Sequence, residues 1–472
     1  MNYKTVIGLE IHAELKTKTK LFCGCAVEFD AAANSRVCPV CCGMPGALPV
    51  LNSEAVDLAI RAGLALGCKI EKFSMFDRKN YFYPDLPKAY QITQFFKPIC
   101  TNGGMKINDR FYEIERIHIE EDAGKLIHNK SSKFTLVDYN RASVPLIEIV
   151  TAPVFNSGKQ AKRFLQLVNL TLKYAGVCSG KMEQGALRCD VNISVMPYYS
   201  SVLGTRTEIK NLNSYRAVES AIEKESKRQI DILENGGKIK RQTLKYDNNT
   251  DTITVLREKE GVRDYRYFKD PDLPPLVITQ QQTDSQQKLL PELPLEKMQR
   301  YESEYGLNSA TADIIVSNPD MADFFEQSLT YYHEPKIISD IITVDLINRT
   351  KRQGNKAADI KISPEDIAKI CKMIRENRIS RNSAKVLLRI LFECGGDPEQ
   401  TAKSNNLIMK SGTSAVNDAI NAVLKQNPKA LVQYRSGCEK VFGFFMGQVC
   451  RKIGGSANPA IIKEALEKAL KD

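Results

Sequence analysis

The sequence predicts an α+β protein in which a large domain, built on a mainly antiparallel sheet, precedes an all-α domain and a small helical tail domain. Strand-like alternation recurs through the first 290 residues, and helical segments interrupt it irregularly, without a strict βαβ series. From about residue 291 the pattern is helical to the end. Because 472 residues exceed one compact core, we expect domains at 1–290, 291–403 and 404–472.

Three segments carry the clearest strand signals. Residues 6–14 and 189–195 alternate apolar and polar side chains with period two, which is typical of strands with one buried face. Residues 144–150 are almost entirely apolar, which is typical of a strand buried on both faces. These strands are expected to form the centre of the sheet.

Helices are expected where a serine cap begins and a glycine ends an apolar stripe. Three such segments lie between the strands, at 53–67, 157–176 and 214–235, with Ser53, Ser157 and Ser214 as candidate caps. A domain boundary is expected after the proline-rich residues 271–276 and the polar stretch 280–287. Further on, Ser363 and Pro364 begin another strong helix.

Charge suggests a polyanionic partner. The net charge is +11, and residues 404–472 hold ten basic and five acidic residues, so this short tail carries nearly half of it. A basic helical tail suits contact with RNA. A solvated helical bundle in a basic protein without such a partner is the alternative.

Four cysteines form the sharpest local signal. Cys23 and Cys25 precede Cys38 and Cys41 by a twelve-residue loop, a spacing that suits a structural zinc ion in a tetrahedral sulfur site. Residues 1–15 show no secretory pattern, and no apolar run approaches 18 residues, so a reducing cytoplasmic location is expected and favours metal ligands over disulfides. Reduced thiols without a metal are the alternative.

Carboxylates and one imidazole lie on several predicted strands. Glu10 and His12 point the same way from one strand, about 7 Å apart. The remaining candidates are Glu120 and Glu121 at the end of a strand-like run, Asp190 on a polar strand face, and Glu148, which needs a partner in its apolar strand. Convergence of these groups would suit a hard divalent cation such as Mg²⁺. Solvated polar strand faces are the alternative.

A loop at residues 79–91 mixes basic residues with aromatic ones, including Lys79, Tyr81 and Lys88. Such a loop suits contact with phosphates or stacking on a base, although a well-packed loop is the alternative. The chain has no P-loop, no Rossmann glycine fingerprint and no plausible serine or cysteine triad. Those absences argue against the common nucleotide-binding motifs and against a serine amidase.

Long motifs in order resemble the B subunit of the three-subunit bacterial and organellar aspartyl/glutamyl-tRNA(Asn/Gln) amidotransferase. They lie at residues 6–12, 38–41, 43–52, 79–94, 118–125, 137–142, 187–192, 208–214 and 264–268. The resemblance covers essentially the whole chain. It implies an open α+β cradle with a zinc knob, a helical domain and a basic tail that contacts tRNA.

The resemblance also implies an activity. The chain would use ATP and Mg²⁺ to phosphorylate the side-chain carboxylate of misacylated Glu-tRNA(Gln) or Asp-tRNA(Asn). A partner amidase, the A subunit, would release ammonia from glutamine, and a small C subunit would complete a heterotrimer. An acid and histidine cluster without a triad fits phosphoryl transfer, which depends on metal ions and positioning.

Carried over position by position, Glu10, His12, Glu120, Glu121 and Asp190 fall on the family's magnesium positions, with Glu148 as a further catalytic candidate. The four cysteines fall on its zinc positions, and Lys79, Tyr81 and Lys88 match the loop beside its active site, where they would contact phosphate or the acyl-adenosine.

The sequence departs from the family at three places. Ala89 stands where glycine is usual, Gln184 replaces an acid, and residues 241–245 differ from the usual run. A non-catalytic tRNA-binding scaffold and a stand-alone metal-dependent hydrolase or nuclease are the competing functions.

Overall fold

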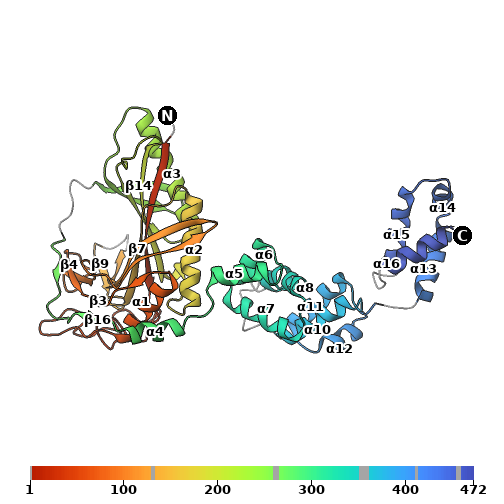
Figure 1. The fold of residues 1–472 in the computed structure, drawn as a ribbon, viewed down its shortest axis with the longest axis horizontal. Coiled ribbons are helices and arrows are strands. Elements are labelled where there is room, and N and C mark those ends of the chain that lie inside the picture. The colour runs from red at the N-terminus through yellow and green to blue at the C-terminus, as the bar shows by residue number, and fades with distance from the viewer. Residues whose placement is uncertain are drawn as a thin grey trace. The chain divides into compact units, whose positions relative to one another are not determined.

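The computed structural model describes residues 3–128, 133–258, 265–349, 361–409, 413–452 and 459–471. It divides into two compact units, Met1–Pro294 and Leu295–Asp472 (Figure 1). Unit 1 carries the sheets and unit 2 is helical, so the predicted α+β class with a helical C-terminal part is confirmed. Motif residue Asp264 lies outside the described residues.

Unit 1 is built on a sheet of nine strands in the order β14-β13-β12-β11-β1-β10-β7-β6-β2. Within the described residues, β12 and β13 form its single parallel pair, and its other neighbours are antiparallel. Its strands are β1 Tyr3–Glu14, β2 Lys69–Ile70, β6 Cys100–Ile107, β7 Arg110–Glu121, β10 Pro145–Thr151, β11 Leu187–Pro197, β12 Thr207–Leu212, β13 Gln242–Asp247 and β14 Thr252–Glu258.

Three smaller sheets accompany the large one. They pair β15 Phe268–Lys269 with β4 Asp77–Asn80 and β5 Tyr90–Thr93, β16 Leu276–Val277 with β3 Phe73–Ser74, and β8 Lys125–His128 with β9 Thr135–Asp138. Gln94, which follows β5, accepts a hydrogen bond from the backbone N–H of Ile119 in β7. The small sheet that carries Lys79 is therefore anchored beside the end of β7.

Helices α1 Ser53–Ala65, α2 Gly158–Tyr174 and α3 Tyr215–Glu234 pack on the large sheet (Figure 1). Alternation along β1 explains the layering, because Leu9, Ile11 and Ala13 are almost fully buried while Glu10 and His12 point to the other face. The helices thus cover the apolar face and leave the polar face for chemistry.

Helix caps largely follow the sequence. Ser157 and Ser214 cap α2 and α3 as predicted, but Ser53 is the first residue of α1, and Asn52 is its cap. The Asn52 side chain accepts a hydrogen bond from the backbone N–H of Glu54, and asparagine caps as well as serine does.

The polar stretch 280–287 is a helix, although the sequence suggested only a boundary there. A capping box between Thr279 and Gln282 begins α4 Gln280–Lys288. Arg61 of α1 donates to the side chain of Gln286 at 2.7 and 3.0 Å. Polar contacts, not an apolar stripe, hold this helix in unit 1.

Unit 2 contains α5 Pro294–Ser303, α6 Ser309–Val316, α7 Pro319–Tyr331, α8 Pro335–Asp340, a π-helical turn Ile341–Leu346, α10 Pro364–Arg375, α11 Arg381–Cys394, α12 Pro398–Ser404, α13 Thr413–Gln426, α14 Pro428–Arg435, α15 Lys440–Lys452 and α16 Pro459–Lys471. Ser363 and Pro364 begin α10 with a capping box, as predicted. Helices α13 to α16 share a hydrophobic cluster that includes Ile420, Phe445 and Leu466. No described helix is long and apolar enough to cross a membrane.

Candidate active site

The polar face of the large sheet gathers acidic and histidine side chains from five neighbouring strands. The register places Glu10 opposite Asp190 and Val150, and His12 opposite Glu148 and Arg188. Further along the sheet, Glu148 lies opposite His118, and Asn192 lies opposite Glu208. Because side chains opposite each other on one face lie about 5 Å apart, the register itself builds the site.

The first group, which we call the histidine group, consists of His12, His118, Glu120 and Glu148. Nε2 of His12 lies 3.5 Å from a carboxylate oxygen of Glu120 and 3.5 Å from one of Glu148. Nε2 of His118 lies 3.2 Å from Glu148 and 3.8 Å from Glu120. Two imidazoles and two carboxylates therefore alternate around one centre.

Electrostatics ties the histidine group together. Burial would lower the pKa of both histidines, but Glu148 and Glu120 outweigh it and raise the pKa of His12 and of His118 to about 9. Burial likewise opposes the charge of Glu148, but the two imidazoles hold the pKa of its carboxyl well below the usual range. Without a metal ion, the group is therefore a network of imidazolium and carboxylate at neutral pH.

The second group, which we call the lysine group, consists of Glu10, Asp190, Glu208 and Lys210. The Lys210 ammonium lies 2.5 Å from a carboxylate oxygen of Asp190 and 2.7 Å from one of Glu208. Asn192 donates a hydrogen bond of 2.7 Å to Glu10. Burial, together with the charges of Glu148 and Asp190, raises the pKa of Glu10. Glu10, a member of the lysine group, is thus also within electrostatic range of Glu148 in the histidine group.

Both groups offer donor sets for a cation. Ligand atoms of His12, Glu120 and Glu148 lie within 4.8 Å of one another, as do those of Glu10, Asp190 and Glu208. Three carboxylates suit a hard ion such as Mg²⁺, whereas the mixed imidazole and carboxylate set is less selective. The Lys210 ammonium already satisfies two carboxylates of its group, so a cation bound there would have to displace it.

Glu121 does not join either group. Neighbouring residues of a strand point to opposite faces, so Glu121 points away from the face that carries Glu120. Its carboxylate accepts a hydrogen bond from the backbone N–H of Ile92 at 2.9 Å and pairs with the Lys88 ammonium at 2.5 Å. The structure therefore ties Glu121 and Lys88 to each other beside the site, and roles for them on a metal ion or phosphate stay predictions.

Lys79 faces the site from β4 of the small sheet. Burial opposes its charge, but Glu120 and Glu148 raise the pKa of the Lys79 ammonium above its usual value. The ammonium also lies 5.8 Å from the ring centre of Tyr81 and 5.1 Å from that of Tyr265. The structure thus brings Lys79 and Tyr81 to the histidine group, and Lys79 supplies a fixed positive charge.

Four cysteine sulfurs converge in the loop after β1. The Sγ atoms of Cys23, Cys25, Cys38 and Cys41 lie within 4.8 Å of one another, and those of Cys38 and Cys41 are 3.9 Å apart. A tetrahedral zinc ion with Zn–S bonds of about 2.3 Å separates its sulfurs by about 3.8 Å, so the four cysteines fit such an ion. Hydrogen bonds within the cluster, first from Cys23, lower the pKa of the Cys41 thiol to about 4.

The cysteine loop is fastened to the edge of the site. Asn34 donates to the carbonyl of Val137 and accepts from the backbone N–H of Tyr139. The Tyr139 hydroxyl donates to the carbonyl of Pro84, in the loop that carries Lys88. A Cβ added at Gly43 would lie 2.7 Å from Lys88 Cγ, so glycine permits this close approach. The cysteine loop therefore supports the loop beside the acidic face.

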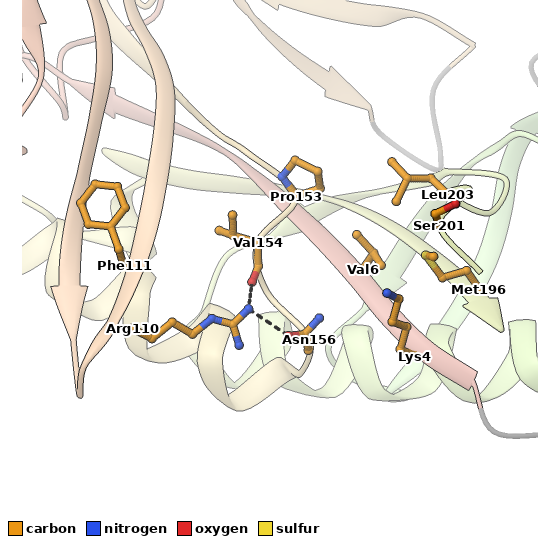
Figure 2. Close-up of a pocket in the computed structure, with 10 residues that line it drawn as sticks. All are labelled: Lys4, Val6, Arg110, Phe111, Pro153, Val154, Asn156, Met196, Ser201 and Leu203. Atoms are coloured by element: carbon orange, nitrogen blue, oxygen red, sulfur yellow. Dashed lines mark hydrogen bonds between the residues drawn. The ribbon is translucent and has the colours of Figure 1, made fainter. Parts of the chain in front are cut away.

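A pocket of about 310 Å³ lies toward the other end of the same strands (Figure 2). In it the Arg110 guanidinium donates to the carbonyl of Val154 and to the side chain of Asn156. None of its ten lining residues is an acid, histidine or cysteine. Without a carboxylate, imidazole or thiol in its lining, this pocket offers no side chain of the kinds that usually hold a metal ion, so the acidic face remains the candidate active site.

Comparison with known proteins identifies the family. The profile of the GatB/GatE catalytic domain matches residues 5–284, and that of the GatB domain matches residues 323–470. The chain belongs to the GatB family. The same resemblance was predicted from the sequence motifs, and it is confirmed.

Related GatB proteins match along the full length. Three of them are each named as the B subunit of aspartyl/glutamyl-tRNA(Asn/Gln) amidotransferase. The protein of Ruminiclostridium cellulolyticum is 44% identical, and the match covers 100% of this chain and 98% of that protein. The protein of Thermodesulfovibrio yellowstonii is 43% identical over 100% of both chains, and that of Caldicellulosiruptor saccharolyticus is 44% identical over 100% and 99%.

Sequence reasoning missed three members of this GatB site, His118, Glu208 and Lys210. His118 precedes Glu120 by two residues on the same strand and so shares its face, a signal that the sequence contains. Glu208 and Lys210 have the same spacing in β12, but the place of β12 beside β11 is a long-range fact that no local pattern contains.

Proposed function

We propose that this chain phosphorylates the side-chain carboxylate of glutamate or aspartate on a misacylated tRNA, at the expense of ATP, and that ammonia then converts the acyl phosphate into an amide. The observation that carries the proposal is the convergence of the histidine group, the lysine group and Lys79 on one face of the sheet. The names of the GatB relatives supply the tRNA and the amide transfer.

The reaction divides into two balanced steps. A carboxylate oxygen attacks the γ-phosphorus, the bond to the β-phosphate oxygen breaks, and ADP leaves. Ammonia then attacks the acyl carbon, inorganic phosphate leaves, and the nitrogen loses a proton. Positioning and charge compensation dominate phosphoryl transfer, so no protein nucleophile is needed.

In this proposal the residues have distinct roles. The carboxylates of Glu10, Asp190 and Glu208, or His12 with Glu120 and Glu148, would hold Mg²⁺. When bound, the ion supplies positive charge to the phosphate oxygens. Lys79 provides a second, fixed positive charge toward the transferring group, and Glu148 orients both imidazoles. The four cysteines would hold zinc in a structural role.

Ammonia would come from a partner. The relatives are named as one subunit of an amidotransferase, which implies further subunits, and the chain was predicted to lack a serine amidase site. We therefore propose an amidase subunit and a small third subunit as partners in a heterotrimer, in the cytoplasm. A non-catalytic scaffold is the competing function, and it predicts no ATP turnover.

The test is ADP release by the complex reconstituted with its partner subunits, with and without Glu-tRNA(Gln). ADP formation should require the mischarged tRNA in the unmodified protein. It should vanish in Glu10→Ala, while tRNA binding stays within about two-fold, since Glu10 lies on a rigid strand and is proposed to hold the ion. Normal turnover in Glu10→Ala would place the kinase site elsewhere and leave a scaffold.

We also propose that residues 404–472 form a tRNA-contacting tail domain, because the segment has an excess of basic residues and α13 to α16 have a hydrophobic cluster of their own. Removing the tail should weaken tRNA affinity and flatten its dependence on salt, because fewer counterions are released on binding. Filter binding over a salt series measures both, and an unchanged slope contradicts an RNA-contacting tail.

A further inference from the structure

Five aromatic side chains form a continuous ladder beside the histidine group, and the proposed chemistry gives none of them a role. The members come from three segments that are distant in sequence. Tyr81 follows β4, Phe95 and Phe96 follow β5, and Tyr265 and Tyr267 precede β15. We call them the aromatic ladder.

The rings contact one another in order. Tyr81 and Tyr265 meet edge to face with centroids 5.9 Å apart, and Tyr265 meets Tyr267 in the same way at 5.9 Å. Tyr267 stacks on Phe95 at 3.9 Å with the planes 9° apart, and Phe96 lies edge-on to Phe95 at 5.1 Å. The contacts run without a gap from Tyr81 to Phe96.

A buried carboxylate holds the outer end of the ladder. Oδ2 of Asp77 accepts the backbone N–H groups of Phe95 and Phe96 at 2.8 and 3.0 Å, and Asp77 is fully buried. Next to them, Gln94 donates to the Ser74 hydroxyl, which donates to the carbonyl of Lys97. The backbone that presents the two phenylalanines is therefore fixed before any ligand arrives.

Backbone conformation also fixes the inner part. Arg266, between the two tyrosines, has φ of 47°, a left-handed conformation that costs a residue with a side chain about 1 kcal/mol or more. Such strain persists where the surroundings impose it and is frequent at ligand-binding sites. Here it accompanies two tyrosine rings that contact each other, although they are separated by one residue.

Phe95 and Phe96 remain exposed despite this rigid support. Their exposed fractions are 46% and 55%. Exposed apolar rings that lie side by side, as these two do, point to a binding surface, unlike apolar residues scattered singly. A flat ring stacked there would gain contact without a further cost of ordering the protein.

The inner end of the ladder reaches the candidate active site. The Lys79 ammonium lies over Tyr265 and Tyr81, and it is within electrostatic range of Glu120 and Glu148. The Tyr267 hydroxyl is likewise within range of Lys79, Glu148 and Glu120. The ladder therefore connects the exposed rings of Phe95 and Phe96 with the carboxylates of the site.

We propose that the exposed end of the aromatic ladder, at Phe95 and Phe96, stacks an adenine ring whose phosphates or ester-linked amino acid extend to the histidine group. The inference rests on the proposed function, which brings two adenines to this site, that of ATP and that of the terminal adenosine of the acylated tRNA. Aromatic stacking requires only the face of the base, so the ladder explains affinity and not base identity.

The experiment measures the binding of ATP and of Glu-tRNA(Gln) by reconstituted complexes that carry Phe95→Leu or Phe96→Leu. Each substitution keeps an apolar side chain but removes the ring. Equilibrium dialysis gives the Kd of ATP in the presence of Mg²⁺, and filter binding gives that of Glu-tRNA(Gln). At least one ligand should bind about 5- to 150-fold more weakly. Phe96→Tyr keeps the ring and should bind as the unmodified protein does.

Phe111→Leu is the matched control. Phe111 is a phenylalanine at 58% exposure, at the beginning of β7 and on the wall of the pocket in Figure 2. Phe111 and Glu120 are nine positions apart along the strand, a distance of about 30 Å. Neither Kd should change in this variant, and thermal unfolding of all variants checks that they are folded.

The two sources of adenine give different results. Weaker ATP binding alone assigns the ladder to the nucleotide. A variant can bind the tRNA more weakly than the unmodified protein does, yet bind equally well once the tRNA lacks its terminal adenosine. That result assigns the ladder to the acceptor end. Unchanged affinities for both ligands overturn the proposal. A tRNA defect that persists without the terminal adenosine also overturns it, and so does loss of assembly with the partner subunits, which would make the ladder a protein interface.

Failure of this inference differs from failure of the proposed function. Binding is measured without turnover, whereas the proposed function is tested by ADP release in Glu10→Ala. If Glu10→Ala loses ADP release while the ladder variants bind both ligands normally, the proposed function holds and only the stacking role of the ladder is contradicted.

Discussion

The histidine group and the lysine group lie side by side on one sheet face but compensate their negative charge differently. In the first, two imidazoles with pKa values near 9 balance two carboxylates. In the second, one ammonium balances Asp190 and Glu208. The first balance is lost as pH rises through about 9, whereas the lysine, whose pKa is raised despite burial by the two carboxylates, stays charged there. We infer that the two groups respond differently to protons and to added cations.

The largest expected effect is on ADP formation. Glu120→Gln and Asp190→Asn each remove one negative charge, from the histidine and the lysine group respectively, while conserving shape. Each should lower mischarged-tRNA-dependent ADP release by about 10³-fold, because a lost charge contact in the transition state costs roughly 4 kcal/mol. A full effect from only one of the two would assign the chemistry to that group.

Glu121→Gln is the control for Glu120→Gln. It neutralises the adjacent carboxylate, which faces the other way and pairs with Lys88. ADP release should fall by much less than in Glu120→Gln. Equal losses in the two variants would contradict the assignment of Glu120 to the active site and of Glu121 to the loop contact beside it.

The second prediction concerns stability against pH in metal-free protein. The folded pKa of His12 and of His118 is raised above 6.5. The stability that they contribute is therefore fully present below pH 6.5 and is lost as pH rises through about 9, by at most about 3 kcal/mol for each histidine. Urea unfolding at pH 6, 7.5 and 9 measures the loss.

His118→Gln provides the comparison for that series. It should remove much of the decline, because one raised pKa is deleted. Lys210→Met should leave the decline in place, since the lysine group does not depend on an imidazole. An equally steep decline in His118→Gln would show that other groups titrate in this window.

The difference between the groups also explains what could be predicted from sequence. Period-two alternation placed Glu10 and His12 on one strand face and Asp190 on the polar face of another strand. The fold class followed from the same alternation together with the helix caps between the strands. Alternation says nothing about which strands are neighbours, so Glu208 and Lys210 were missed although they lie in a recognised motif. Glu121 was assigned through the motif, which does not record that neighbouring residues face opposite ways.

Local spacing gave a different result for the cysteines. The four predicted zinc ligands come together because a short loop brings two close pairs to one place. A site made within one loop can be predicted from spacing, whereas a site made across five strands requires the sheet order. The aromatic ladder, built from three distant segments, was likewise invisible apart from Tyr81.

A third prediction tests the lysine group directly. Lys210→Met removes the ammonium and leaves Asp190 and Glu208 uncompensated. Without metal the variant should be less stable by about 1–3 kcal/mol, below the cost of breaking a fully buried pair because Lys210 is about one-third exposed. Thermal unfolding with a Mg²⁺ series measures it, and added Mg²⁺ should stabilise the variant more than the unmodified protein. Equal gains would show that the lysine group does not take the ion.

The smallest effect is expected at Ala89, where the family usually has glycine. Ala89 has φ of 61°, in the left-handed region. Its loop supplies Lys88 to Glu121, and the strand that follows, β5, supplies the backbone N–H of Ile92. Ala89→Gly should relieve strain and stabilise unit 1 by roughly 0.5–1 kcal/mol, measured by urea unfolding. Ser143→Gly is a comparison at another residue in the left-handed region, with φ of 68°. If Ala89→Gly also changes ADP release, then the loop controls the histidine group through Glu121 and its neighbour Glu120. If release is unchanged, the histidine group is positioned by its strands alone, and the departure at Ala89 affects only stability.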